Sequence, residues 1–167
     1  MGLWGRVRRF LEPSRELVLF GQRVESRLAT LDSDDAEAMM RRWLGDPDKY
    51  LWKPALSPQE LPPLLSRLPE SIRALLAEHE SVQEQFGDVC LSRASVATVP
   101  EDPRLVRIGN AGDSDILVAP DGRITHWYWG TPFEDSDHFE SLFHFLLDSA
   151  SLIHDDVARD LGVDPVS

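Results

Sequence analysis

The most restrictive feature of this chain is the segment from Leu105 to Trp129, where three short runs of branched and aromatic residues alternate with glycine-containing connections. Such runs favour β-strands, and the connections are typical of antiparallel neighbours. The sequence therefore predicts a β-meander with strands over residues 105–108, 115–119 and 123–129. Only Pro120-Asp121-Gly122 is expected to be a tight turn. The longer connection from Gly109 to Asp113 could instead form a loop that holds a ligand.

Apolar residues recur at helical spacing on both sides of this meander. Before it, the pattern predicts helices over 14–31, 36–44, 57–68 and 69–81, an extended connection over 47–58, and strands at 86–92 and 96–99. After it, Asp137 and Glu140 form a D-x-x-E pattern typical of a helix start. The apolar face of that helix would contain Phe139, Leu142, Phe143, Leu146 and Leu147. We expect this helix to cover one face of the sheet.

Length and composition indicate one ordinary globular domain of 167 residues, 42% of them hydrophobic. No apolar run approaches the roughly 20 residues that a membrane-spanning helix needs, and the N-terminus lacks a secretory cleavage pattern. Cys90 is the only cysteine, which excludes an internal disulfide and a cysteine-based zinc site. We expect a cytoplasmic protein that binds no membrane.

The net charge of −12 is concentrated near the C-terminus. Residues 101–167 hold 14 acidic and 4 basic side chains, a net charge of −10. Such a charge repels phosphate backbones and attracts cationic surfaces, so nucleic-acid binding is disfavoured and a basic protein partner is favoured. The alternative is that the acids only provide solubility.

The strongest candidates for chemistry are Asp113 and Asp115, whose D-x-D spacing could hold a divalent cation. Turn capping is the simpler explanation of so short a pattern. Gly112-Asp113-Ser114 is similar to the nucleophile block of a serine esterase family, but no convincing Asp-x-x-His follows it. No phosphate-binding loop occurs, and no histidine pair has the spacing of a helix-borne zinc site. We therefore expect no catalysis, no metal and no cofactor.

Aromatic residues alternate at the end of the meander, in His126-Trp127-Tyr128-Trp129. On a strand, Trp127 and Trp129 would lie on one face and His126 and Tyr128 on the other. One face must be core, and the alternation alone leaves open which. Exposed tryptophans beside acids would make a binding hot spot for a basic partner.

Taken together, several segments resemble the SUKH superfamily. They are the helix pair over 57–80 with its central Leu68-Pro69, the run 105–109 continuing through Gly112-Asp113 to 115–118, the run 121–127, and the run 137–146. The resemblance covers about residues 56–150. The superfamily's usual Asn-Gly-Gly after the second helix is replaced here by His79-Glu80-Ser81. Bacterial members of this superfamily commonly act as immunity proteins against toxins, and yeast relatives regulate cell-wall assembly.

The resemblance implies an α+β fold with a curved antiparallel sheet flanked by helices. Residues 1–55 would be an N-terminal helical addition, 56–150 the core, and 151–167 a short helix and tail of a single domain. The implied function is that of an immunity protein, which binds a cognate bacterial toxin and occludes its active-site cleft. Alternatives are a metal-dependent hydrolase that uses Asp113 and Asp115 with a histidine, and a regulatory or scaffold protein. We place the partner-binding surface on Asp113, Asp115, Trp127, Trp129, Glu134, Asp135, Asp137 and Glu140.

Overall fold

The protein has an α+β fold in which one antiparallel sheet of eight strands packs against helices. The computed structural model describes residues 14–54 and 62–166. Its α-helices are α2 (Arg15–Leu28), α3 (Ser33–Leu44), α4 (Glu70–Glu78), α5 (Leu142–Ile153) and α6 (Asp155–Asp160). Three 3-10 helices join them, namely η1 (Pro63–Arg67), η2 (Arg93–Ser95) and η3 (Phe133–Asp135). No helix among the described residues has the length and apolar composition needed to cross a membrane.

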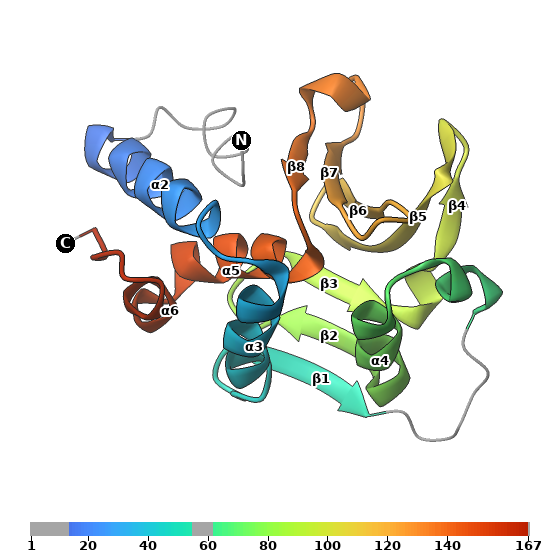
Figure 1. The fold of residues 1–167 in the computed structure, drawn as a ribbon, viewed down its shortest axis with the longest axis horizontal. Coiled ribbons are helices and arrows are strands. Elements are labelled where there is room, and N and C mark those ends of the chain that lie inside the picture. The colour runs from blue at the N-terminus through green and yellow to red at the C-terminus, as the bar shows by residue number, and fades with distance from the viewer. Residues whose placement is uncertain (1–13, 55–61, 167) are drawn as a thin grey trace.

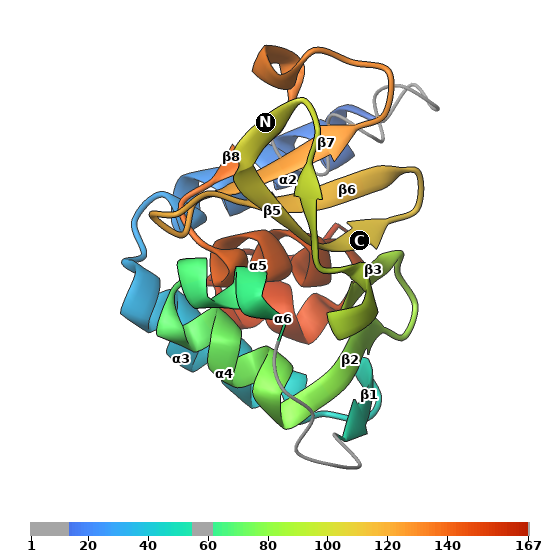
Figure 2. The same ribbon diagram turned by 90° about the vertical axis from the view of Figure 1, so that its right-hand side faces the viewer.

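The sheet follows the order β1-β2-β3-β5-β6-β7-β8, and β4 pairs with β5 beside this path. Its strands are β1 (Tyr50–Pro54), β2 (His79–Glu84), β3 (Val89–Ser92), β4 (Ala97–Val99), β5 (Asp102–Ala111), β6 (Ser114–Val118), β7 (Ile124–Tyr128) and β8 (Asp137–Phe139). Strands β5 to β8 curve into a trough, in agreement with the curved sheet that we expect from the sequence (Figure 1). Below the trough lies α5, with α6 beside it (Figure 2).

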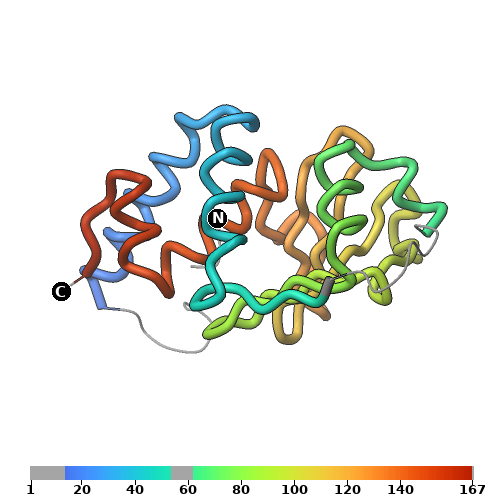
Figure 3. Tube along the Cα trace, turned by 90° about the horizontal axis from the view of Figure 1, so that it is seen from below, coloured from blue at the N-terminus to red at the C-terminus, as the bar shows by residue number. Residues whose placement is uncertain are grey.

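The helices gather on one side of the sheet. Figure 3 shows β1 and β2 along one edge of the molecule, with α3 and α4 on the side that faces α5. On β7 the side chains of Ile124, His126 and Tyr128 are buried on this side, whereas Thr125 and Trp127 are half-buried on the opposite one. We call the side that carries Thr125 and Trp127 the outer face. The alternation thus puts the histidine and the tyrosine in the core.

The predicted meander is confirmed as β5-β6-β7, but its connections differ from the prediction. Gly109 to Ala111 belong to β5, and the register pairs Ala111 directly with Ser114. Only Gly112 and Asp113 connect the two strands, with φ of Gly112 at +62°, as a type II′ turn requires. The first connection is therefore the tighter one, and no ligand-holding loop forms there.

Several predicted element boundaries are wrong. In its described part the helix predicted over 57–68 is only the 3-10 helix η1, the strand predicted at 86–92 begins at Val89, and the helix predicted over 36–44 begins at Ser33. The helix over 69–81 ends at Glu78, and His79 begins β2. The helix predicted to start at Asp137 begins at Leu142 with Ser141 as its N-cap, because Asp137 to Phe139 pair with β7 as β8. The extended connection over 47–58 contains the edge strand β1, and the helix start predicted at Ser57 lies outside the described residues.

The helices expected near residues 14–31 and 36–44 both form. Ser14 caps α2, where its hydroxyl accepts a hydrogen bond from the backbone N–H of Leu17. Asp32 caps α3, where its carboxylate accepts a hydrogen bond from the backbone N–H of Asp35. The buried face of α2 contains Phe20, Val24 and Leu28, which agrees with the predicted apolar stripe. The short helix expected after residue 151 is α6.

The ring of α5 that contacts the meander is Phe145, which is not on the predicted apolar face. Phe145 is fully buried, with its ring centroid 5.1 Å from that of His126 on β7 and 5.3 Å from that of Phe139 on β8. Phe143 is also buried, but the Arg41 guanidinium of α3 lies over its ring at 5.7 Å. Phe143 thus contacts α3, and Phe145 is the residue that faces the sheet.

We expect Phe145→Ala to lower the free energy of unfolding by about 3–5 kcal/mol, because it leaves a cavity between α5 and the sheet. Urea denaturation followed by circular dichroism measures this loss. Leu19→Ala on α2 is the control, since Leu19 is exposed and should change stability by about 0.5 kcal/mol or less. Equal effects of the two substitutions would contradict the assigned packing of α5.

Candidate protein-binding site

The connection between β7 and β8 presents a tryptophan to solvent. The backbone N–H of Thr131 donates to the carbonyl of Tyr128 at 3.1 Å, which closes a turn with Trp129 and Gly130 at its centre. Gly130 has φ +78°, the conformation that the third position of a type II turn requires. At the second position of this turn, the Trp129 side chain is 58% exposed.

Behind this turn, the half-buried Trp127 supports the loop from the outer face of β7. The indole N–H of Trp127 donates to the carbonyl of Thr131 at 2.8 Å. The Trp127 ring lies 5.0 Å from that of Phe133, at the start of η3. These contacts join the exposed turn and η3 to the sheet, so Trp129 lies on a turn that the sheet holds in place.

Three exposed acids lie in the same connection as Trp129 or in the neighbouring turn. Glu134 and Asp135 are exposed in η3 of the same loop. Asp113 is exposed in the neighbouring β5–β6 turn, and its carbonyl accepts a hydrogen bond from the Trp129 backbone N–H at 3.5 Å. We call Asp113, Trp127, Trp129, Glu134 and Asp135 the acidic tip.

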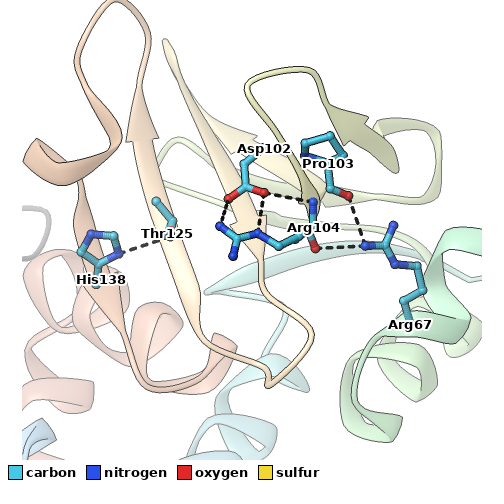
Figure 4. A network of polar contacts seen from close by, with 6 residues as sticks. All are labelled: Arg67, Asp102, Pro103, Arg104, Thr125 and His138. Carbon is cyan, nitrogen blue, oxygen red and sulfur yellow. Dashed lines mark hydrogen bonds and ion pairs between the residues drawn. The ribbon is translucent and has the colours of Figure 1, made fainter.

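Most other acids of the C-terminal third are already paired with cations of the chain. Arg104 donates to Asp102 through two nitrogens (Figure 4), and these bonds lower the pKa of Asp102 to about 2. Asp156 and Asp160 lie 2.8 and 2.9 Å from the cationic groups of Lys49 and Arg42. Ion pairs also hold Asp121 and Asp155. The net charge of the C-terminal third therefore overstates the charge available to a partner.

By contrast, Glu134 and Asp135 form no ion pair within the part of the chain that the structure describes. Their carboxylates are exposed, are not compensated by a cation of the described residues, and lie in the same connection as the large exposed ring of Trp129. An arrangement of this kind attracts a cationic surface and offers it an apolar anchor.

Two of the predicted partner-binding acids are buried. Asp115 is 8% exposed on the outer face of β6, with an Arg107 nitrogen 3.9 Å from its carboxylate. Asp137 is 4% exposed in β8 and accepts a hydrogen bond from the Tyr128 hydroxyl at 3.0 Å. The structure thus places both in structural positions and leaves them outside the acidic tip.

Glu140 is exposed but lies at the other end of the sheet. It follows Phe139, which pairs with Ile124 at the start of β7, whereas Trp129 follows the end of β7. A strand of five residues spans roughly 17 Å. Glu140 instead lines a surface hollow with Asp121 and Gly122. The predicted site residues therefore separate into a tip of five, two buried acids and one distant acid.

The structure brings together a serine and a histidine that the sequence analysis did not pair. The Ser114 hydroxyl oxygen lies 2.6 Å from Nε2 of His126, and both residues are fully buried. Ser114 also donates to the Ala111 carbonyl at 2.5 Å. A hydroxyl has one proton, so Nε2 must donate to the serine oxygen. A nucleophilic serine needs the opposite, a basic nitrogen that accepts its proton, so this pair is structural.

Neither the potential metal ligands nor the one cysteine indicates a metal site or a reactive thiol. Within residues 14–54 and 62–166, no group of three or more histidine, cysteine, aspartate or glutamate side chains is arranged to hold a metal ion. Cys90 is half-buried in β3, and burial raises the pKa of its thiol, which lowers its thiolate fraction.

We expect Asp137→Ala to lower the free energy of unfolding by about 1–3 kcal/mol, because the buried Tyr128 hydroxyl loses an acceptor. Asp135→Ala, which removes an exposed carboxylate of the acidic tip, should change stability by about 0.5 kcal/mol or less. Chemical denaturation of both variants tests the division into structural and exposed acids. A destabilising Asp135→Ala combined with a neutral Asp137→Ala would reverse that division.

Comparison of the chain with models of protein families, with curated proteins and with solved structures found no match. What the protein does must therefore be inferred from the arrangement of its own side chains.

Proposed function

We propose that this protein is an immunity protein that binds a cognate bacterial toxin through the acidic tip and occludes a basic active-site cleft. The observation that carries the proposal is an exposed Trp129 in the same connection as the exposed Glu134 and Asp135, which form no ion pair with the described residues. The resemblance of residues 56–150 to the SUKH superfamily supplies the biological role.

The acidic tip has the two properties that such an inhibitor needs, namely negative charge and an exposed aromatic side chain. A toxin that acts on a polyanionic substrate has a cationic cleft, so a negatively charged tip is drawn toward it and accelerates encounter. Aromatic side chains are the most frequent hot spots of protein interfaces, because they bury a large area for few rotatable bonds. The acids would therefore govern association, and Trp129 would govern dissociation.

The first test uses the product of the adjacent reading frame as the candidate toxin. Glu134→Lys with Asp135→Lys should slow association about tenfold or more at low salt, because two attractive charges become repulsive. The effect should shrink as the screening length falls from about 10 Å at 0.1 M salt to about 3 Å at 1 M. Surface plasmon resonance with the purified pair measures both rates.

The matched control is Asp121→Lys with Glu140→Lys, which makes the same change in net charge at the other end of the sheet. It should slow association much less than the tip variant. Trp129→Ala should leave the association rate nearly unchanged and speed dissociation about 30-fold, as expected for loss of a hot spot worth about 2 kcal/mol. Equal effects of the two charge reversals would show that the tip is not the contact surface.

Inhibition should be stoichiometric, because occlusion consumes one inhibitor per toxin. In a growth-protection assay and a titration of toxin activity, Asp113→Asn with Asp115→Asn should reduce protection only as far as affinity falls. Added magnesium, manganese or zinc should have no effect. Substoichiometric, metal-dependent destruction of the toxin, a nucleotide or a sugar substrate, lost in this double variant, would instead establish a hydrolase.

A further inference from the structure

A carboxyl group is buried at the end of β2, far along the sheet from the acidic tip. Glu84 is 1% exposed. The hydroxyl of Ser149 on α5 lies 2.9 and 3.0 Å from its two carboxyl oxygens, and a backbone hydrogen bond joins it to Val89. Glu84 thus connects the β2–β3 hairpin to the central helix.

No cation within residues 14–54 and 62–166 pairs with this carboxyl group. Among the described residues, none of the ion pairs includes Glu84. The acidic groups that face it are Asp88 in the same hairpin and Tyr50 on β1, whose buried hydroxyl has no hydrogen-bond partner among the described residues. Burial raises the pKa of Glu84 to about 7, and the negative charge of Asp88 adds to the shift.

The connection between β2 and β3, residues 85–88, closes directly over this group. A Cβ atom on Gly87 would lie 1.9 Å from Oε2 of Glu84 and 2.7 Å from Cδ1 of Ile153, so a side chain at this position would have to displace the carboxyl group and the Ile153 methyl group. The rest of the connection is loosely held. Phe86 is 70% exposed, with its ring 6.4 Å from that of His154, and the Gln85 N–H donates to the Lys49 carbonyl at 2.9 Å.

We propose that residues 85–88 form a proton-controlled latch, which closes over the neutral Glu84 carboxylic acid and opens when that acid loses its proton. An ionised carboxylate in this position has no cation partner, so it gains free energy by reaching water. Lifting Gly87 exposes it with a small movement, since the hairpin connection is its nearest cover. Opening moves Phe86 away from His154 and changes the surface at this end of the sheet.

The direction of the pH effect follows from the shift in the pKa of Glu84. An open latch returns this pKa toward its ordinary value of about 4.3. Both states are protonated at low pH, and closure is then strongest. As pH rises from there through about 7, the open state loses its proton first, so closure weakens.

Other ionisable groups near the latch either oppose this weakening of closure with rising pH or do not contribute to it. Burial lowers the pKa of His154, because the closed connection disfavours the charged imidazole, so protonation of His154 loosens this region as pH falls. Lys49 faces the latch from the start of β1, but Asp46 and Asp156 pair with its ammonium group at 2.9 and 2.8 Å. Loosening with rising pH is therefore specific to Glu84.

Hydrogen–deuterium exchange of the full chain tests the latch. After correction for intrinsic exchange rates, protection of the amides of residues 85–89 should fall on the order of 50-fold between pH 5 and pH 8. Amides in the middle of α5 serve as the internal reference and should keep their protection. Glu84→Gln, which keeps the shape and stays neutral, should abolish the decrease.

Two further variants separate Glu84 from its neighbours. His154→Asn should retain the decrease, because the histidine titrates in the opposite direction. Asp88→Asn, an exposed change that removes a like charge, should move the transition to lower pH. A wild-type profile without the decrease, a profile unchanged by Glu84→Gln, or one abolished by His154→Asn would overturn the proposal.

Discussion

The fold depends on burying a helix on every side. Residues 142–151 of α5 are all buried, so this helix needs covering elements around its whole circumference, unlike a surface helix with one apolar stripe. The sheet covers one side through Phe145, and α2, α3 and α6 cover the others. Polar side chains on so buried a helix require partners. His144 finds them in the Leu31 carbonyl and in Ser141, and Ser149 finds one in Glu84.

Acidic residues have different physical roles in different parts of this chain. Lys49, whose side chain is 8% exposed, lies 4.7 Å from the Trp43 ring centre and pairs with Asp46 and Asp156, so α6 is joined to α3 and β1. Asp137 accepts a hydrogen bond from a buried tyrosine, and Glu84 is a buried acid that pairs with no cation of the described residues. Only exposed and uncompensated acids act on a distant partner, because buried pairs cancel their own fields. A count of acids per segment cannot make this distinction.

Local sequence patterns predicted the elements that depend on interactions between residues close in the sequence, such as hairpins and apolar stripes. The meander, the presence of α2 and α3, and the apolar stripe of α2 were all predictable. Strand β2 was not, because His79-Glu-Ser-Val-Gln-Glu84 has little β-propensity and becomes a strand only by pairing with β1 and β3. Asp137 and Glu140 imitate a helix cap, but pairing of β8 with β7 outweighs that signal and shifts the cap to Ser141.

In the candidate site, too, the sequence could not predict features that depend on residues far apart in the chain. Alternation placed Trp127 and His126 on opposite faces, but the sequence could not decide which face α5 covers, since that depends on residues some 20 positions later. Asp113 and Asp115 have the same chemistry and differ in burial because one lies in a turn and the other in a central strand. Position in the sheet thus decides whether a carboxylate stabilises the fold or remains available to a partner. The acidic tip is available because the Trp129-Gly130 turn and η3 carry Glu134 and Asp135 beyond the strands and away from the basic side chains that neutralise acids elsewhere.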